Sequence, residues 1–90
     1  MERWEDVEQA LSSRGRLRIL RALAERYEEA LTKYGLERST GMMPVELRRQ
    51  LRVLLKLGWV EELPYAPKKY QLNLKKEFVK HLSRLLRRIS

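Results

Sequence analysis

The 90-residue sequence contains no cysteine. This absence excludes a disulfide framework and any metal site built on thiolates. There is a single histidine, His81, and one imidazole does not hold a metal ion without several carboxylate ligands beside it. The sequence therefore predicts a protein with no metal site and no cofactor.

Long hydrophobic runs are absent as well. No apolar stretch approaches the length of a membrane span, and the chain does not open with a signal-peptide pattern, so we expect a cytoplasmic protein. A glycine-rich phosphate loop and a catalytic acid–base pair are also missing. Glu61 and Glu62 are neighbours on an expected strand, where successive side chains point to opposite faces. We therefore expect that the protein is not an enzyme.

Positive charge dominates what is present. The chain carries 20 Lys and Arg against 12 Asp and Glu, and its formal net charge is +8. Residues 1–31 hold six arginines against seven acidic residues, whereas residues 32–90 hold fourteen basic residues against five. Such an excess favours a polyanionic partner, either nucleic acid or an acidic membrane surface, but an ordinary solvated surface accounts for the charge alone equally well.

The first part of the chain predicts two helices. Apolar side chains repeat at helical spacing over residues 3–12. Ser12 and Ser13 then offer caps for a second helix, whose apolar stripe extends over residues 17–31. This stripe consists of Leu17, Leu20, Leu23, Ala24, Tyr27 and Leu31.

Two more helices are expected in the middle of the chain. Thr32 can cap a short helix over 33–39, and Gly41 then ends it, because glycine accepts the left-handed backbone of a helix C-terminus. A proline suits the first turn of the next helix, 44–57. Gly58 supplies a second C-terminal signal.

A hairpin and a final helix follow. Residues 59–63 and 69–73 read as strands, joined by a loop with two prolines, and make a two-stranded hairpin. Asn73 can cap a last helix over 74–89. The predicted fold class is α+β, mostly helical: a winged helix-turn-helix in a single domain, in the order helix, helix, short helix, longer helix, hairpin, helix.

The helix 44–57 combines an apolar face with a basic one. Leucines mark the expected core face: Leu47, Leu51, Leu54 and Leu55. Another face carries Val45, Arg48, Arg49 and Arg52. The planar fork of arginine can bond guanine O6 and N7 together, and it suits phosphate equally well. A basic helix after a tight glycine turn is typical of a helix-turn-helix, although a solvated arginine face on a core helix is the alternative.

The loop of the hairpin carries Tyr65, Lys68 and Lys69 beside its prolines. Its lysines are able to meet phosphates. An ordinary exposed turn explains the same residues, but a position directly after a basic helix favours a DNA-contacting wing over residues 63–69.

Three stretches resemble the ArsR-like winged-helix regulators. LSSRGRLRIL at 11–20 resembles their opening helix, and LTKYGL at 31–36 with TGM at 40–42 resembles their second helix and turn, in a form common among archaeal members. QLRVL at 50–54 with GWV at 58–60 resembles the passage from recognition helix to wing. The resemblance covers about residues 11–73.

The resemblance implies roles for several side chains. Arg48, Arg49 and Arg52 match family positions that face DNA, while Leu47, Leu51 and Leu54 match core positions. Two residues depart from the pattern, because Glu37 stands where a small residue is usual and Gln50 where many members have histidine. The Cys and His clusters of the metal-sensing branch are missing, so metal sensing does not carry over.

The last helix has a narrow apolar seam among basic residues, which suits packing on a partner helix. Regulators of the type it resembles often dimerise through a terminal helix, so residues 74–90 are expected to form a homodimer interface. The interface residues would be Phe78, Leu82, Leu85, Leu86 and Ile89. Packing back on its own domain is one alternative, and lying on a membrane surface is another.

The leading hypothesis is a dimeric transcription regulator that binds double-stranded DNA. A dimer would set its two recognition helices about 34 Å apart, which is roughly one turn of the duplex. Phosphate contacts would come from Lys33, Thr40, Lys68 and Lys69. Base contacts would come from Val45, Glu46, Arg48, Arg49 and Arg52. Two alternatives are a non-specific architectural DNA binder and a winged helix used for protein–protein contact through Trp59, Tyr65 or the last helix. RNA binding is less favoured, because the sequence has no recognisable motif of exposed aromatic residues on which RNA bases would stack.

Overall fold

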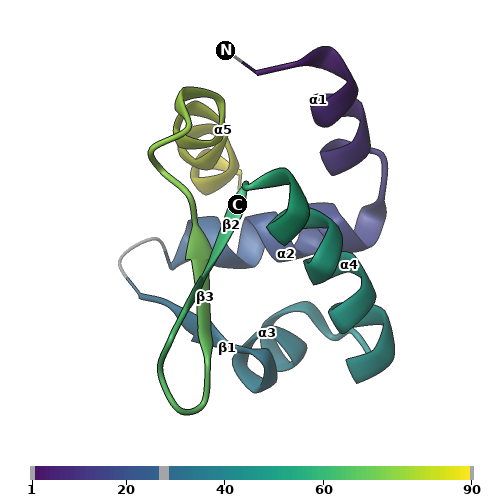
Figure 1. Ribbon diagram of the computed structural model, residues 1–90, viewed down its shortest axis with the longest axis vertical. Helices are drawn as coiled ribbons and strands as arrows, with labels where there is room; N and C mark the ends of the chain where they lie inside the picture. Colours follow the sequence, from purple (N-terminus) through teal and green to yellow (C-terminus); the bar gives the residue numbers. More distant parts are fainter. Residues whose placement is uncertain (1, 27–28, 90) are drawn as a thin grey trace.

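The computed structural model describes residues 2–26 and 29–89, which form five helices and one small sheet (Figure 1). Helix α1 (Trp4–Leu11) leads into α2 (Arg14–Glu25). The side chain of Ser13 accepts a hydrogen bond from the backbone N–H of Arg16 at 3.2 Å, which confirms the predicted cap.

The prediction that the second helix continues to residue 31 is wrong. Helix α2 ends at Glu25, and Leu31 belongs to the short strand β1 (Leu31–Thr32). Leu31 pairs there with Tyr70, so a contact with a distant strand overrides the helical spacing of the apolar residues. Tyr27, the other member of the predicted stripe beyond α2, lies outside the described residues.

The helix-turn-helix follows the predicted pattern closely. Helix α3 (Lys33–Thr40) begins where the Thr32 side chain accepts from the N–H of Gly35 at 3.0 Å. Gly41 ends α3 in the left-handed conformation, with φ 72°. Helix α4 (Pro44–Leu57) begins at a proline and ends at Gly58, with φ 76°.

The expected two-stranded hairpin is part of a three-stranded sheet. Strands β2 (Val60–Leu63) and β3 (Lys69–Leu72) pair antiparallel, and β1 adds to the other side of β3, giving the order β1-β3-β2. A two-residue strand has too little alternation to be recognised in a sequence, and it forms here only because β3 offers its free edge.

The predicted role of Asn73 is also wrong. Helix α5 (Glu77–Arg88) starts after Lys76 and not after Asn73. The Asn73 amide instead donates to the carbonyl oxygen of Gly58 at 2.8 Å, and its side-chain oxygen accepts from the N–H of Lys75 at 3.2 Å. Asn73 thus ties the end of α4 to the segment that leads into α5.

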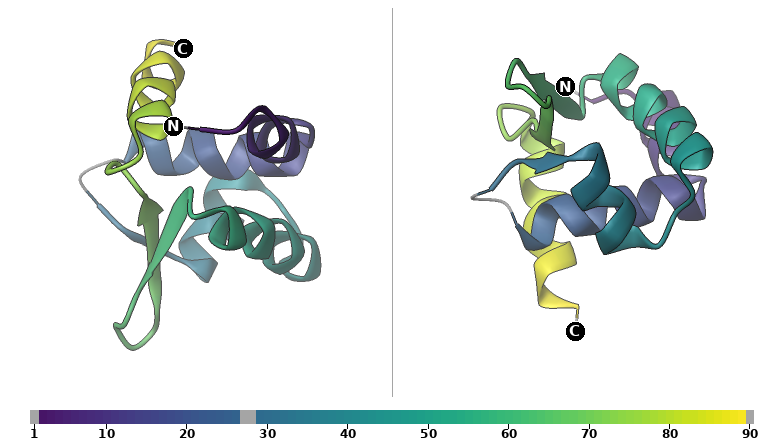
Figure 2. Two further views of the ribbon diagram at one scale, coloured as in Figure 1. Left: turned by 45° about the horizontal axis from the view of Figure 1, so that its top comes forward. Right: turned by 90° about the horizontal axis from the view of Figure 1, so that it is seen from below.

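Helix α2 is the centre of the molecule, because it contacts each of the other helices and β3 (Figure 2). The buried core is apolar apart from Ser83, and it comes from all five helices and from both strands of the hairpin. Its largest members are Trp59, Tyr70, Ile19, Leu20, Leu23, Leu36, Leu47, Leu51, Leu54 and Val79. The architecture confirms the predicted fold class, a mostly helical winged helix-turn-helix with a C-terminal helix.

Helix α5 packs on its own domain with one face. Val79 and Ser83 are buried, and Leu82 and Leu86 are half-buried against the core. The alternative that the last helix packs back on its own domain is therefore correct for this face, and the helix it contacts is α2.

Candidate nucleic-acid interface

Helix α4 separates its side chains into a buried face and an exposed face, as predicted. Leu47, Leu51 and Leu54 are buried in the core, because they face α2 and α3 across the middle of the domain. The other face is open to solvent. Val45, Arg48, Arg49 and Arg52 are all exposed on it.

The three arginines of the exposed face are not equivalent. Arg49 donates to the carboxylate of Glu46, one turn earlier on the same helix. Arg48 and Arg52 form no hydrogen bond or ion pair within the described part of the chain. Uncompensated cations on an exposed helix are available to an anionic partner without breaking an internal contact.

The turn before α4 uses its polar groups internally. The Thr40 hydroxyl donates to the carbonyl oxygen of Leu36 at 2.6 Å and accepts from the N–H of Met42 at 3.2 Å. A phosphate oxygen only accepts and the hydroxyl has one proton to donate, so a phosphate contact would require half-buried Thr40 to give up its bond to Leu36. Lys33, at the start of α3, is exposed to solvent.

The wing, residues 63–69, projects from the same end of the molecule as α3 and the start of α4 (Figure 1). Its exposed Tyr65 ring lies 5.4 Å from the Nζ of Lys69, measured to the ring centroid. Lys69 begins β3 and is half-buried, so it is not at the tip of the loop. Lys68 is exposed and lies 3.4 Å from a carboxylate oxygen of Glu62.

A groove of about 290 Å³ separates the wing from α3. Lys33 and Lys68 line it from opposite sides, so two of the predicted phosphate-binding residues share one opening. Tyr34 also lines this groove, and Arg38 donates to its hydroxyl at 3.0 Å. Both side chains are exposed, and neither was predicted as a site residue from the sequence. Their i, i+4 spacing on a short helix was the signal that could have found them.

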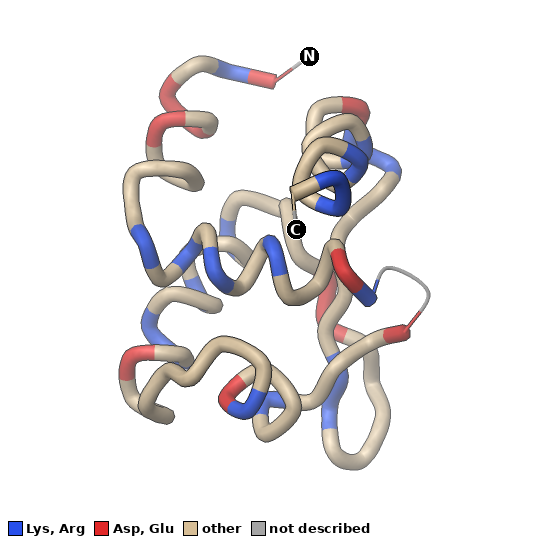
Figure 3. Tube along the Cα trace, turned by 180° about the vertical axis from the view of Figure 1, so that it is seen from behind, with Lys and Arg blue, Asp and Glu red and all other residues tan. Residues whose placement is uncertain are grey.

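Acidic and basic residues are unevenly distributed over the helices. The Cα trace coloured by charge shows acidic residues on α1 and mostly basic residues on α2 and α5 (Figure 3). In α1, Glu5 and Asp6 occupy the first turn, while Arg87 and Arg88 occupy the last turn of α5.

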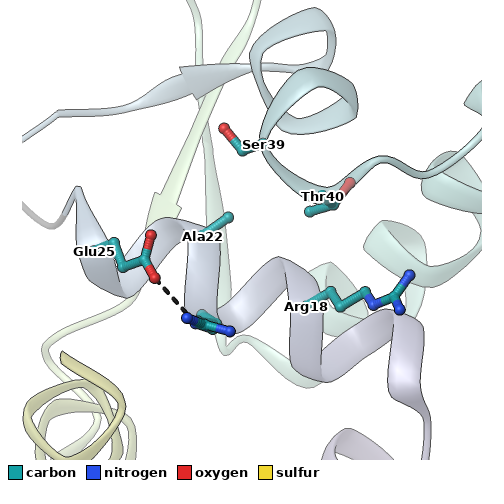
Figure 4. Close-up of a pocket in the computed structure, with 6 residues that line it drawn as sticks. Arg18, Ala22, Glu25, Ser39 and Thr40 are labelled. Carbon is teal, nitrogen blue, oxygen red and sulfur yellow. Dashed lines mark hydrogen bonds and ion pairs between the residues drawn. The ribbon is translucent and has the colours of Figure 1, made fainter. Parts of the chain in front are cut away.

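A second opening of about 290 Å³ lies between α2 and α3, lined in part by Arg18, Arg21 and Thr40 (Figure 4). Arg21 is already paired with Glu25, four residues later on the same helix, at 3.0 Å. This opening is not on the exposed arginine face of α4, so we assign it no part in the interface.

Within 2–26 and 29–89, no group of three or more His, Cys, Asp or Glu side chains is arranged to hold a metal ion. His81 instead lies 3.2 Å from the exposed carboxylate of Glu77. None of the helices described is both long and apolar enough to cross a membrane.

Residues 13–62 match a family model described as bacterial regulatory protein, arsR family. The match covers more than half of the chain and extends from the start of α2 into β2, so it includes the whole helix-turn-helix. No curated protein and no solved structure matches the chain significantly. The chain belongs to the arsR family of bacterial regulatory proteins, and its helix-turn-helix domain is that of a DNA-binding transcription regulator.

Proposed function

We propose that this protein is a sequence-specific regulator that places α4 in the major groove of duplex DNA. The observation that carries the proposal is the exposed arginine face of α4, where Arg48 and Arg52 are free of internal partners in the described chain. The major groove admits a helix and presents guanine O6 and N7, which an arginine fork binds together.

The contacts divide into base-facing and phosphate-facing groups. The base-facing side chains are those on the exposed face of α4: Val45, Glu46, Arg48, Arg49 and Arg52. The phosphate-facing groups surround them at the same end of the molecule. They are Lys33 and Thr40 on α3, and Tyr65, Lys68 and Lys69 on the wing, which lies on the backbone or in the minor groove.

Selection from a random duplex library, followed by affinity measurements across salt concentrations, tests the proposal. We expect one enriched sequence, bound at least a thousandfold more tightly than random duplex. Arg52→Ala should lower the preference for that sequence by about 1–3 kcal/mol if its contact is bidentate. The exposed Arg14 at the start of α2 supplies the matched control, and Arg14→Ala should leave the preference unchanged.

Two other outcomes would overturn the regulator proposal. Equal binding to all duplexes, with a steep dependence on salt, would identify an architectural DNA binder. No binding to duplex at moderate salt would identify a protein–protein contact module.

We also propose that the protein acts as a homodimer through α5 and α1. Leu85 and Ile89 on α5 are each 60% exposed, Phe78 is 37% exposed, and Trp4 on α1 is 70% exposed. Leu82 and Leu86 border this surface, although they are half-buried against the core. Figure 1 places α1 and α5 at the end of the molecule away from the wing, so pairing there leaves the DNA-facing end open.

Charge supports the same pairing, because the acidic first turn of α1 complements the basic end of α5. Sedimentation of the purified protein tests it. Leu85→Lys should convert a dimer into a monomer, and Trp4→Lys separates a contribution of α1 from that of α5. Met43, which is exposed on the turn before α4, gives the control Met43→Lys, expected to remain dimeric. A monomeric wild type would refute the dimer and leave DNA binding by α4 as a separate question.

Two finer features belong to the same proposal. We place the protein in the cytoplasm, since its ligand is genomic DNA and its chain has no cysteine to form disulfides. The archaeal form of the α3 and turn sequence stays a prediction.

A further inference from the structure

A chain of hydrogen bonds joins the first turns of α4 to α2. Arg16 on α2 donates through Nη1 to the side-chain oxygen of Gln50. The amide nitrogen of Gln50 donates to one carboxylate oxygen of Glu46 at 2.6 Å. The other oxygen of Glu46 accepts from Arg49. We call these four side chains the Arg16 relay.

The first member of the relay is held from α1. Arg16 Nε donates to the carbonyl oxygen of Gln9 at 2.8 Å, and its Nη2 lies 3.3 Å from the hydroxyl oxygen of Ser12. Gln9 lies in the last turn of α1 and Ser12 is its C-cap. Three nitrogens of one guanidinium are thus occupied, and Arg16 forms no ion pair within the described residues. A planar group bound on three sides has one orientation.

Close packing brings the two helices together at this point. A Cβ placed on Gly15 would lie 3.1 Å from Cγ of Gln50 and 3.1 Å from Cε of Met42. The first turn of α2 therefore lies directly against the Gln50 side chain. The absence of a side chain at position 15 leaves the room in which Gln50 reaches Arg16.

The relay imposes an order on its members. Gln50 must turn its oxygen toward Arg16 and its NH₂ toward Glu46, because arginine only donates and a carboxylate only accepts. With one oxygen of Glu46 held by Gln50, the other is presented to Arg49. Both Glu46 and Arg49 are partly exposed on the proposed base-reading face. A carboxylate accepts from cytosine N4, and an arginine donates to guanine.

We propose that Arg16 is a positioning residue for base recognition: through Gln50 it orients Glu46 and Arg49 on α4, and it thereby sets their base preference without itself contacting DNA. This inference rests on the proposed function of α4. It assigns a role in specificity to α2, a helix whose other contacts are those of a scaffold.

Two variants interrupt the relay at different points, and a third serves as control. Arg16→Met removes the donors and one charge, and Gln50→Met removes the central link with no change in charge. Arg14→Met removes one charge from the same helix without touching the relay. Backbone amide spectra establish whether each variant is folded. If Arg16→Met does not fold, the comparison of Gln50→Met with Arg14→Met tests the proposal.

The first readout uses the full-length protein without DNA. In Arg16→Met, the side-chain NH₂ signals of Gln50 and the carboxylate carbon signal of Glu46 should shift, whereas in Arg14→Met they should stay in place. Unchanged signals in Arg16→Met would overturn the proposal.

The second readout is the affinity for the selected duplex divided by the affinity for random duplex. It should fall about tenfold in both relay variants, within the range for one well-formed base contact, while random-duplex binding of Arg16→Met matches that of Arg14→Met. Equal loss on both duplexes in Arg16→Met would show a general role in binding, and an unchanged ratio would show no role; either result would overturn the proposal. A wild type without any base preference would refute the regulator function itself, and the DNA-free signals would still decide whether Arg16 orients Glu46.

Discussion

Two glycines flank α4, since Gly41 ends α3 just before it and Gly58 ends α4 itself, and replacing each by alanine tests how these two helices are terminated. Gly41 and Gly58 have φ values of 72° and 76°. Their N–H groups donate to carbonyl oxygens of the preceding helix, Gly41 to Glu37 and Gly58 to Leu54 and Leu55. An alanine in this left-handed region costs about 1–2 kcal/mol, because its Cβ approaches the following carbonyl oxygen.

The surroundings of the two positions predict a difference between the variants. A Cβ at Gly41 would meet no atom of the described residues within 4 Å, so Gly41→Ala carries the backbone cost alone. A Cβ at Gly58 would lie 3.3 Å from Cε of Lys76, whose Nζ pairs with Glu2 at 3.7 Å. The Lys76 side chain is flexible near its end, so its displacement adds about 0.5 kcal/mol.

Urea unfolding and thermal melting followed by circular dichroism measure both effects. In a domain of this size, a loss of 1–2 kcal/mol lowers the melting temperature by roughly 4–16 °C. The free energy of unfolding should be lower for Gly58→Ala than for Gly41→Ala by about 0.5 kcal/mol, which is the cost of displacing Lys76. Gly58→Asn should be milder than Gly58→Ala, since asparagine tolerates the left-handed region. The reasoning is refuted if Gly41→Ala is as stable as the wild type, or if the order of the two alanine variants is reversed.

Three further predictions concern charge, pH and the N-terminal segment. Lys33→Gln should reduce the slope of log affinity against log salt by about 0.9 and keep the base preference, and a changed preference would place Lys33 on bases. The pKa of Tyr70 is raised above 10.0, mainly because the side chain is buried and secondly because the Glu62 carboxylate lies beside it. The folded protein then keeps a phenol proton that the unfolded chain loses, so stability falls as pH rises beyond about 10. Tyr70→Phe should lose less stability between neutral and alkaline pH, and an identical pH dependence would contradict this. The buried indole N–H of Trp59 donates to Glu2 at 2.9 Å. Trp59→Phe and Glu2→Ala, which each remove one partner of this bond, should therefore show a coupling energy of about 1–2 kcal/mol in a double-mutant cycle, and additive effects would exclude the contact.

Local features of the sequence were sufficient for the helix-turn-helix. Thr32, Gly41 and Gly58 each act through atoms within a few residues of themselves, so the bounds of α3 and α4 follow from caps and turns. The spacing of Leu47 and Arg48 likewise separates the buried from the exposed face of α4, since the period of a helix is a local property.

Contacts between distant residues explain what the sequence did not predict. Strand β1 exists because Leu31 and Thr32 find partners on β3, and that pairing also limits how far the preceding helix extends. Asparagine is a common helix cap, but the side-chain amide of Asn73 donates a hydrogen bond to the carbonyl oxygen of Gly58 instead. In both cases a tertiary partner competes with the local preference and is the more favourable one.

By itself the sequence determined the order of the elements, the basic face of α4 and the positions of the wing lysines, because periodicity, capping and charge are written in neighbouring residues. The tertiary structure added which of those cations already have a partner beyond their own helix. It placed Lys68 3.4 Å from Glu62 across the hairpin and left Arg48 and Arg52 without a partner within the described chain. It also brought Arg16 to Gln50, across 34 residues of sequence, through a close approach of two helices that no local pattern encodes.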